Sequence, residues 1–294
     1  MSGKYPKNQA KYLRELLVSD ELVMAPGAAD ILTARLIERV GFPAIYMTGF
    51  GASASMIGSP DIGILTQTEM TTHARDMVRA VNIPIVADAD TGYGGPANIE
   101  RTVREYQQTG VAAIHLEDQT LPKRCGQMEG IKLIPTDEMV RRLKCALAVR
   151  GDDDLVIIGR TNALPVLGVE EAIRRAKAYQ RAGVDVVFID SVKRIAEAQA
   201  IAKAIEGQWM ISIVEGNETT QLKADDLKEM GFSLAIYALS ALLSAMRAIQ
   251  ETLNELRDKG TTHGILDQMM TYSEYNEVIN LEHYMELDDK FGSG

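Results

Sequence analysis

The sequence is poor in cysteine, with only Cys125 and Cys145 among its 294 residues. Two cysteines are too few for a disulfide framework, and their separation does not match a zinc site. The chain also lacks an apolar run of roughly 18 residues and a charged-then-apolar leader. We therefore expect a cytoplasmic protein with no membrane span and no secretory signal.

Lysine and arginine are nowhere concentrated in the chain, and its formal net charge is −10. Binding to phosphate backbones depends on clustered cations, so nucleic acid is not expected as a partner. A small anionic substrate would need local positive charge or a metal ion. Hydrophobic residues make up 46% of the sequence, which is enough to bury the core of a barrel-sized domain.

A unit of amphipathic helix, glycine and mostly apolar run recurs along the chain. Such a glycine suits the left-handed conformation at the end of a helix, and a continuous apolar run predicts a strand covered on both faces. The glycines are Gly41, Gly110, Gly183 and Gly231. Strands are predicted at Leu22–Ala25, Ala44–Met47, Pro84–Ala87, Ala112–Leu116, Leu155–Gly159, Val186–Ile189, Met210–Val214 and Ser233–Tyr237. Helices are clearest at Thr66–Val81, Ala97–Gln108, Thr136–Val149, Val169–Arg181 and Ile195–Ile205.

Eight alternating strand–helix units predict an α/β fold of the (β/α)8 TIM barrel type rather than an open doubly wound sheet. No Gly-x-Gly-x-x-Gly motif follows the first strand, which argues against dinucleotide binding. We expect residues 1–294 to form one barrel domain with an opening helix at Asn8–Leu17 and a helical extension at the C-terminus. The amphipathic region Glu274–Phe291 is assigned to subunit contacts.

Asp88 and Asp90 lie where the third predicted strand gives way to a glycine-rich loop. Residues two apart in an extended segment point the same way, so the two carboxylates share a face. Like charges this close favour a cation between them, and Mg²⁺ prefers carboxylate and water oxygens. The alternative is that one aspartate caps the following helix while the other is solvated.

The other predicted strand ends strengthen the metal hypothesis, because strand ends of a barrel converge on one mouth. They carry Thr48 and Gly49, Asp88 and Asp90, Glu117 and Asp118, Arg160 and Asn162, Asp190, Glu215, and Tyr237 and Ser240. Acids after this many buried strands indicate a metal-centred active site. His115 lies inside the fourth strand, and the pattern leaves open whether it faces the mouth or the helices.

Two long connections follow the second and fourth strands, and long loops in a compact domain are usually functional. The first, 49–66, contains Asp61, and the second, 117–136, contains Cys125 beside Lys123 and Arg124. Neighbouring cations would favour the thiolate of Cys125. The second loop is therefore either a lid with an acid–base thiol or a surface loop whose cysteine is unpaired.

The sequence resembles the isocitrate lyase/phosphoenolpyruvate mutase superfamily, and especially its branch of 2-methylisocitrate lyases, 2,3-dimethylmalate lyases and carboxyphosphonoenolpyruvate mutases. The resemblance runs from about Leu16 to the C-terminus. It rests on the segments Thr48–Ser55, Pro60–Asp61, Asp88–Gly94, Leu116–Gln119, Pro122–Gly126, Gly159–Asn162 and Leu234–Tyr237.

This resemblance implies a barrel whose eighth helix is exchanged between subunits, in a homotetramer built from two such dimers. It implies Mg²⁺, with Mn²⁺ as an alternative, held through Asp88, with Asp90, Glu117 and Asp190 acting directly or through water. Backbone donors at Thr48, Gly49 and Phe50, together with Arg160, would bind the carboxylate of an α-keto or 2-hydroxy acid. Asp61 would be an acid–base group near the reacting oxygen. Cys125, on a gating loop with Lys123 and Arg124, would protonate the departing carbanion. Further substrate contacts are expected from Gly126, Gln127, Ser212, Glu215, Thr219 and Tyr237.

Several positions depart from the family pattern, mainly on the substrate side. Gln127 replaces a usual histidine, so Cys125 would have a higher pKa or the substrate would lack a second carboxylate at that place. Asn162 and Asp190 stand where Asp and Glu are common, and Ser212 and Thr220 replace a frequent Asn and Pro. These changes suggest an altered distal half of the substrate.

We therefore expect a Mg²⁺-dependent carbon–carbon lyase that cleaves a 2-hydroxy di- or tricarboxylate of the methylisocitrate or alkylmalate type. The products would be an α-keto acid or glyoxylate and a carboxylate. The alternatives are a decarboxylase or hydrolase of oxaloacetate-like acids, a mutase that acts on a phosphonate carbon–phosphorus bond, and a metabolite-binding barrel without catalysis.

Overall fold

Eight parallel strands close into a barrel in sequence order, and β8 pairs back onto β1. This computed structural model describes residues 8–292, and the expectation of one domain over residues 1–294 extends beyond this part at both ends. The strands are β1 (Val23–Ala28), β2 (Ile45–Met47), β3 (Ile85–Asp88), β4 (Ala113–Glu117), β5 (Val156–Thr161), β6 (Val186–Ile189), β7 (Trp209–Ser212) and β8 (Leu234–Tyr237). Each overlaps one predicted strand, so the (β/α)8 class is confirmed.

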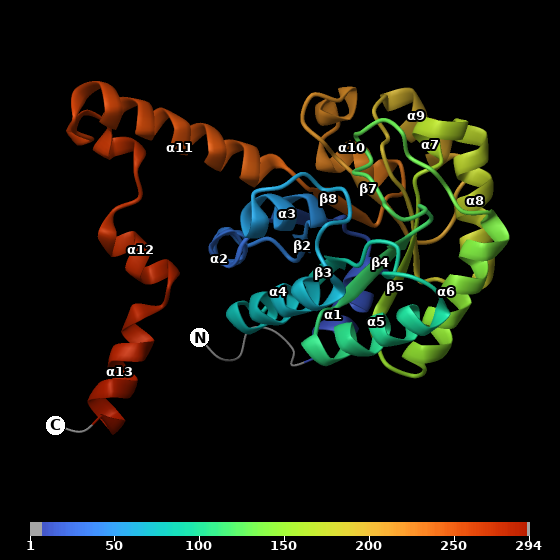
Figure 1. Cartoon of the computed structure of the whole chain (residues 1–294), viewed down its shortest axis with the longest axis horizontal. Coiled ribbons are helices and arrows are strands. Elements are labelled where there is room, and N and C mark those ends of the chain that lie inside the picture. Colours follow the sequence, from blue (N-terminus) through green and yellow to red (C-terminus); the bar gives the residue numbers. More distant parts are fainter. Residues whose placement is uncertain (1–7, 293–294) are drawn as a thin grey trace.

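Helices follow the strands and surround the barrel (Figure 1). They are α1 (Gln9–Leu17), α2 (Ile31–Val40), α3 (Gly49–Ile57), α4 (Gln67–Ala80), α5 (Pro96–Thr109), α6 (Thr136–Arg150), α7 (Leu164–Leu167), α8 (Val169–Ala182), α9 (Ile195–Ala202), α10 (Ala224–Glu229), α11 (Ser240–Lys259), α12 (Tyr272–Val278) and α13 (Leu281–Phe291). Two 3-10 helices, η1 (Glu218–Gln221) and η2 (His263–Gln268), lie in the connections. The opening helix and the five clearest helical patterns are confirmed as α1, α4, α5, α6, α8 and α9. Gly41 and Gly183 end α2 and α8 in the left-handed conformation, as expected.

The long connection after β2 differs from the prediction, because its first half forms helix α3 rather than loop. Thr48 caps this helix by accepting a hydrogen bond from the backbone N–H of Gly51 at 3.2 Å. The small residues of Thr48–Ser55 let the helix pack against the barrel mouth, and Gly49, Gly51 and Ser53 are buried there. The remaining α3–α4 loop, residues 58–66, contains Asp61.

The core has two parts, one inside the barrel and one between the strands and the helices. The inner part contains Tyr46, Val86 and Phe188, together with Leu13 and Leu17 of α1. Helix α1 therefore packs against the amino ends of the strands and closes the bottom of the barrel. This arrangement leaves the carboxyl ends as the face at which a site can form.

The C-terminal helices α11–α13 leave the barrel as an arm (Figure 1). Helix α11 has no buried residue and exposes a row of large apolar side chains. The arm returns to the body at α12, where Arg39 pairs with Glu277 at 2.7 Å and Arg35 donates to the carbonyl oxygen of Val278 at 3.2 Å. Within residues 8–292, no helix is long and apolar enough to cross a membrane.

Candidate active site

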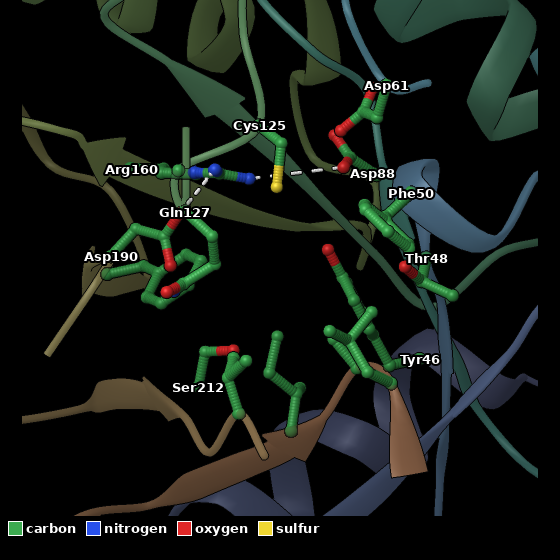
Figure 2. A pocket seen from close by; sticks show the side chains of 16 residues that line it. Tyr46, Thr48, Phe50, Asp61, Asp88, Cys125, Gln127, Arg160, Asp190 and Ser212 are labelled. Carbon is green, nitrogen blue, oxygen red and sulfur yellow. Dashed lines mark hydrogen bonds and ion pairs between the residues drawn. The ribbon is translucent and has the colours of Figure 1, made fainter. Parts of the chain in front are cut away.

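The carboxyl ends of the strands surround a cavity of about 50 Å³ (Figure 2). Acids, a guanidinium and a thiol share its wall with apolar side chains. The lining residues are Tyr46, Thr48, Phe50, Asp61, Asp88, Cys125, Gly126, Gln127, Arg160, Phe188, Asp190, Ser212, Val214, Ile236, Ala238 and Leu239. The expectation that the strand ends converge on one site is therefore confirmed for Thr48, Asp88, Arg160 and Asp190.

The start of α3 lies against the end of β3. Gly49 is required there, because a β-carbon at this position would lie 2.6 Å from Oδ2 of Asp88. The N–H groups in the first turn of a helix have no acceptor within the helix, and Thr48 and Phe50 line the cavity. Helix α3 therefore approaches Asp88 closely, and the backbone N–H groups of its first turn lie at the cavity. There they can donate hydrogen bonds to an anionic ligand.

Arg160 is the central cation of the mouth and is almost fully buried. Its Nη2 lies 2.5 Å from Oδ2 of Asp190, its Nε lies 3.3 Å from Oε2 of Glu117, and its Nη1 lies 3.9 Å from Oδ2 of Asp88. Burial lowers the pKa of Arg160, but these acids outweigh burial and raise it above its usual range. Asn162 accepts a hydrogen bond from Nη2 of Arg160 at 3.1 Å and donates one to Oε2 of Glu117 at 2.8 Å.

Lys123 joins the two loops that carry Asp61 and Cys125. Its Nζ lies 2.5 Å from Oδ1 of Asp61 and 2.7 Å from Oδ1 of Asp90. All three side chains are buried, so the ion pairs are shielded from solvent. The β4–α6 loop, residues 118–135, is held over the mouth, as expected for a lid. Arg124 points outward instead, and its Nη1 donates to the carbonyl oxygen of Glu129 at 3.3 Å.

The buried carboxylates differ in how easily they lose a proton. Burial alone would raise the pKa of Asp88, but the neighbouring His115, Lys123 and Arg160 lower it to about 2. Burial raises the pKa of Asp90 to about 6 and that of Glu117 to about 7, even though Lys123 lies near both. Asp88 is therefore the carboxylate that stays charged across the ordinary pH range, and the best suited to bind a cation.

The thiol of Cys125 reaches the cavity (Figure 2). Burial raises its pKa to about 11, and the charges of Asp61 and Asp190 act in the same direction. The expectation that Lys123 and Arg124 would favour the thiolate is wrong, because Lys123 faces two aspartates and Arg124 faces away. The high pKa comes from burial and not from Gln127, whose backbone N–H lowers it. At neutral pH, Cys125 carries a proton that it can donate.

Four predicted substrate residues, Gly49, Glu215, Thr219 and Tyr237, do not line this cavity, although Gly49 lies against Asp88. Glu215 is exposed and accepts a hydrogen bond from Ser240. Thr219 is buried in η1 and donates to the carbonyl oxygen of Val192 at 3.3 Å. Tyr237 lies on a separate apolar groove beside α2 and α11.

Tyr46 is a cavity residue that the sequence pattern did not predict, and the pattern left open the direction of His115. His115 faces the barrel interior, where its Nε2 lies 3.0 Å from the hydroxyl of Tyr46 and its Nδ1 lies 3.6 Å from Oδ1 of Asp88. Strand alternation could have placed both residues, since Tyr46 lies two before Thr48 and His115 two before Glu117. Burial lowers the pKa of His115 to about 4, so the ring is neutral at ordinary pH.

The acids at the mouth fit a magnesium ion that has few direct protein ligands. Within residues 8–292, no three His, Cys, Asp or Glu side chains converge on one point, because Lys123 and Arg160 lie between the carboxylates. Magnesium usually keeps several waters and takes only one or two carboxylates. Oε1 of Glu117 is buried without a hydrogen-bond partner, so it can accept a bond from such a water.

The protein is a closed (β/α)8 barrel with buried acids, two buried cations and a protonated thiol at its mouth. These features define its class, which is a barrel enzyme with its site at the carboxyl ends of the strands. A model of the phosphoenolpyruvate phosphomutase family matches residues 13–257, and the chain belongs to this family. The resemblance inferred from the motifs is thereby confirmed.

Named relatives of the chain include lyases and hydrolases. It is 42% identical over 287 residues to 2,3-dimethylmalate lyase of Eubacterium barkeri, with 98% of this chain and 99% of the relative covered. A solved oxaloacetate acetylhydrolase with bound 3,3-difluorooxalacetate is 38% identical, with a TM-score of 0.91 and 99% of each chain covered. A phosphonopyruvate hydrolase solved with oxalate and Mg²⁺ is 30% identical, with a TM-score of 0.89 and 97% and 100% covered.

Proposed function

We propose that the protein is a Mg²⁺-dependent lyase that cleaves the C2–C3 bond of an alkyl-substituted 2-hydroxy dicarboxylate. The products are an α-keto acid and a second carboxylate. One observation carries the proposal: Asp61, Arg160 and the protonated thiol of Cys125 line the same cavity. A base, a carboxylate-binding cation and a carbon acid are the groups that this cleavage requires.

Substrate binding uses the charged side of the cavity. Arg160 and the first-turn N–H groups at Gly49 and Phe50 bind the C1 carboxylate. Asp88 would hold the metal, with Asp90, Glu117 and Asp190 acting directly or through water. When bound, Mg²⁺, or Mn²⁺ in its place, supplies Lewis acidity to the oxygen on C2. The relative solved with oxalate and Mg²⁺ supports this arrangement.

Proton transfer uses the two loops. Asp61 accepts the proton of the 2-hydroxyl group, and the electron pair of the C2–C3 bond moves onto C3. The adjacent carboxylate stabilises that charge, and the thiol of Cys125 protonates C3. Asp61 then holds one proton and Cys125 lacks one, so no net proton is consumed. Closure of the β4–α6 loop excludes water from the carbanion.

The distal wall of the cavity favours an alkyl group over a third carboxylate. Val214 and Ile236 are buried apolar residues that line it. Gln127 is uncharged and cannot pair with an anion as a histidinium would. A substituted malate therefore suits this wall better than a tricarboxylate, in agreement with the dimethylmalate lyase among the relatives.

Oxaloacetate hydrolysis is the second candidate, because a neighbour with a TM-score of 0.91 is an oxaloacetate acetylhydrolase. That reaction needs the same metal and the same binding of the keto-acid carboxylate. Its nucleophile is water. After the C2–C3 bond breaks, an acid must still protonate C3, which becomes the methyl carbon of acetate.

The test is incubation with Mg²⁺ and 2,3-dimethylmalate, 2-methylisocitrate, oxaloacetate or phosphonopyruvate, with assay of keto acid and carboxylate products. We expect dimethylmalate cleavage in the wild type and in Cys145→Ser, and a loss of at least about hundredfold in Cys125→Ser. Turnover of oxaloacetate alone, or of phosphonopyruvate alone, would replace the lyase with a hydrolase or a mutase. Stabilisation by Mg²⁺ and oxalate without any turnover would indicate a non-catalytic barrel.

We also propose that α11 is exchanged between subunits, in dimers that pair into a tetramer. Leu243, Met246, Ile249, Leu253 and Leu256 recur every three or four residues along α11 and are exposed. An apolar groove of about 420 Å³ runs beside its base, lined by α2 residues that include Leu36, Ile37 and Val40. Two copies would cover both surfaces at once.

The oligomer is tested by measuring its mass in solution by light scattering. Leu253→Asp should convert a tetramer to smaller species, while Glu251→Gln on the same helix should leave the mass unchanged. A monomeric wild type would contradict the exchange.

A cytoplasmic location stays a prediction from the sequence.

A further inference from the structure

Gln119 lies near the start of the β4–α6 loop, and its side chain is buried, with 1% of its surface exposed. Its Oε1 accepts the backbone N–H of Arg124 at 2.9 Å, and its Nε2 donates to the backbone carbonyl of the same residue at 2.7 Å. The same Nε2 donates to Oε2 of Glu117 at 3.1 Å. A primary amide carries both donors and an acceptor, so it can satisfy this combination where a carboxylate cannot.

These bonds connect two parts of the site that are distant along the loop. Arg124 lies between Lys123, which pairs with Asp61 and Asp90, and Cys125, whose thiol reaches the cavity. Glu117 lies on the opposite, acidic side of the mouth, against Arg160 at 3.3 Å. Through one amide, the position of the Glu117 carboxylate is therefore linked to the backbone that presents Cys125.

Other contacts hold the ends and the tip of the loop but do not make this link. The ends are joined by the antiparallel bridge between Gln119 and Leu133, with the N–H of Thr120 donating to the carbonyl of Lys132 at 2.8 Å. At the tip, Ser191 donates through its hydroxyl to the carbonyl of Gly126 at 2.7 Å. The bond from Ser191 holds the tip against a neighbouring segment, whereas the amide of Gln119 holds the loop against Glu117 on the acidic side of the mouth.

We propose that Gln119 is a positioning residue that holds the Lys123–Gly126 segment closed and couples this closure to the orientation of Glu117. Its amide touches neither the cavity nor the reacting atoms, so it acts through Cys125 and Glu117. Without it, the loop keeps its bridged ends and spends more time open, and Cys125 presents its proton less often. The kinetic part of this inference rests on the proposed lyase function, while the conformational part does not.

The experiment uses Gln119→Met, which keeps the length and the unbranched shape but loses all three hydrogen bonds, and Gln119→Glu, which adds a carboxylate facing Glu117. Thr120→Val is the matched neighbour, since it alters an adjacent side chain and keeps the backbone bond. The metal-free proteins are treated with iodoacetamide, and the labelling rates of Cys125 and Cys145 are followed by mass spectrometry. Cys145 lies on α6, outside the site, and serves as the internal reference.

We expect Cys125 labelling to rise at least tenfold in both Gln119 variants, with the rate at Cys145 unchanged. Thr120→Val should behave as the wild type. With substrate and Mg²⁺, kcat should fall at least tenfold in Gln119→Met while KM changes less than threefold.

Unchanged Cys125 labelling in Gln119→Met would overturn the inference, and so would a parallel rise at both cysteines with a lower melting temperature, which marks a merely structural role. Should the wild type turn over none of the substrates, the lyase proposal fails, and the labelling result still decides the role of Gln119.

Discussion

The backbone N–H of Cys125 donates to the backbone carbonyl of Asp61 at 3.0 Å, and this bond joins the β4–α6 loop to the α3–α4 loop. The proposed carbon acid and the proposed base are thus brought together by the same contact. Opening of the β4–α6 loop would separate them and admit water. The proton-transfer groups are therefore complete only in the closed arrangement, which is the one observed here.

Closure depends on the absence of a side chain at Gly126. A β-carbon there would lie 2.2 Å from Oδ2 of Asp190 and 2.7 Å from Oγ of Ser191. We expect Gly126→Ala to lower kcat/KM by about hundredfold or more, because a shift of the loop by an ångström misplaces Cys125. Gly95→Ala is the control, since a β-carbon at Gly95 meets nothing within 4 Å. Equal activity of the two variants would show that the loop need not close this tightly.

Removal of the Lys123 ammonium should leave two buried carboxylates without their cation. In metal-free protein at pH 8, we expect Lys123→Met to lose about 3 kcal/mol of unfolding free energy. The loss should be smaller at pH 5 than at pH 8, because Asp90 without its cation takes up a proton above the pKa of about 6 that it has beside Lys123, and a protonated Asp90 no longer needs a cation. Urea unfolding at pH 5 and pH 8 measures both values. A loss that is the same at both pH values would contradict the ion-pair explanation.

Magnesium affinity should rise with pH. Burial raises the pKa of Asp90 to about 6 and that of Glu117 to about 7, so both bind protons in the range where ordinary carboxyls are charged. These protons compete with the cation, and binding at pH 8 should be at least about tenfold tighter than at pH 5.5. Calorimetry in buffers of different ionisation enthalpy measures the affinity and the released protons together. In Glu117→Gln, proton release near pH 7 should decrease.

The side-chain amide of Asn162 bridges Arg160 and Glu117. Asn162→Asp would keep the acceptor for Arg160 but replace the donor to Glu117 with a negative charge. We expect a loss of about 1–3 kcal/mol of unfolding free energy at pH 8 in metal-free protein. The loss should be smaller at pH 5, where Glu117 is protonated, and smaller with Mg²⁺ present. An unchanged melting temperature at pH 8 would show that the donor to Glu117 contributes nothing.

The sequence by itself determined the barrel and the location of its site. Helix–glycine–strand units encode local conformation, and a strand covered on both faces must be apolar throughout, so β1 to β8 could be predicted from the order of residues. The same strand ends placed Asp88, Arg160 and Asp190 at one mouth. Helix α3 was missed because its small residues, Gly49 to Ser55, resemble a loop and form a helix only against the barrel.

Only the tertiary structure decided the charges and partners within that mouth. Lys123 precedes Cys125 by two residues, yet it pairs with Asp61 and Asp90 on other elements, and burial rather than sequence neighbours sets the pKa of the thiol. The partners of His115 also come from other strands, because its ring contacts Tyr46 of β2 and Phe188 of β6. Burial and through-space charge depend on residues far apart in the chain, so a local pattern cannot specify them.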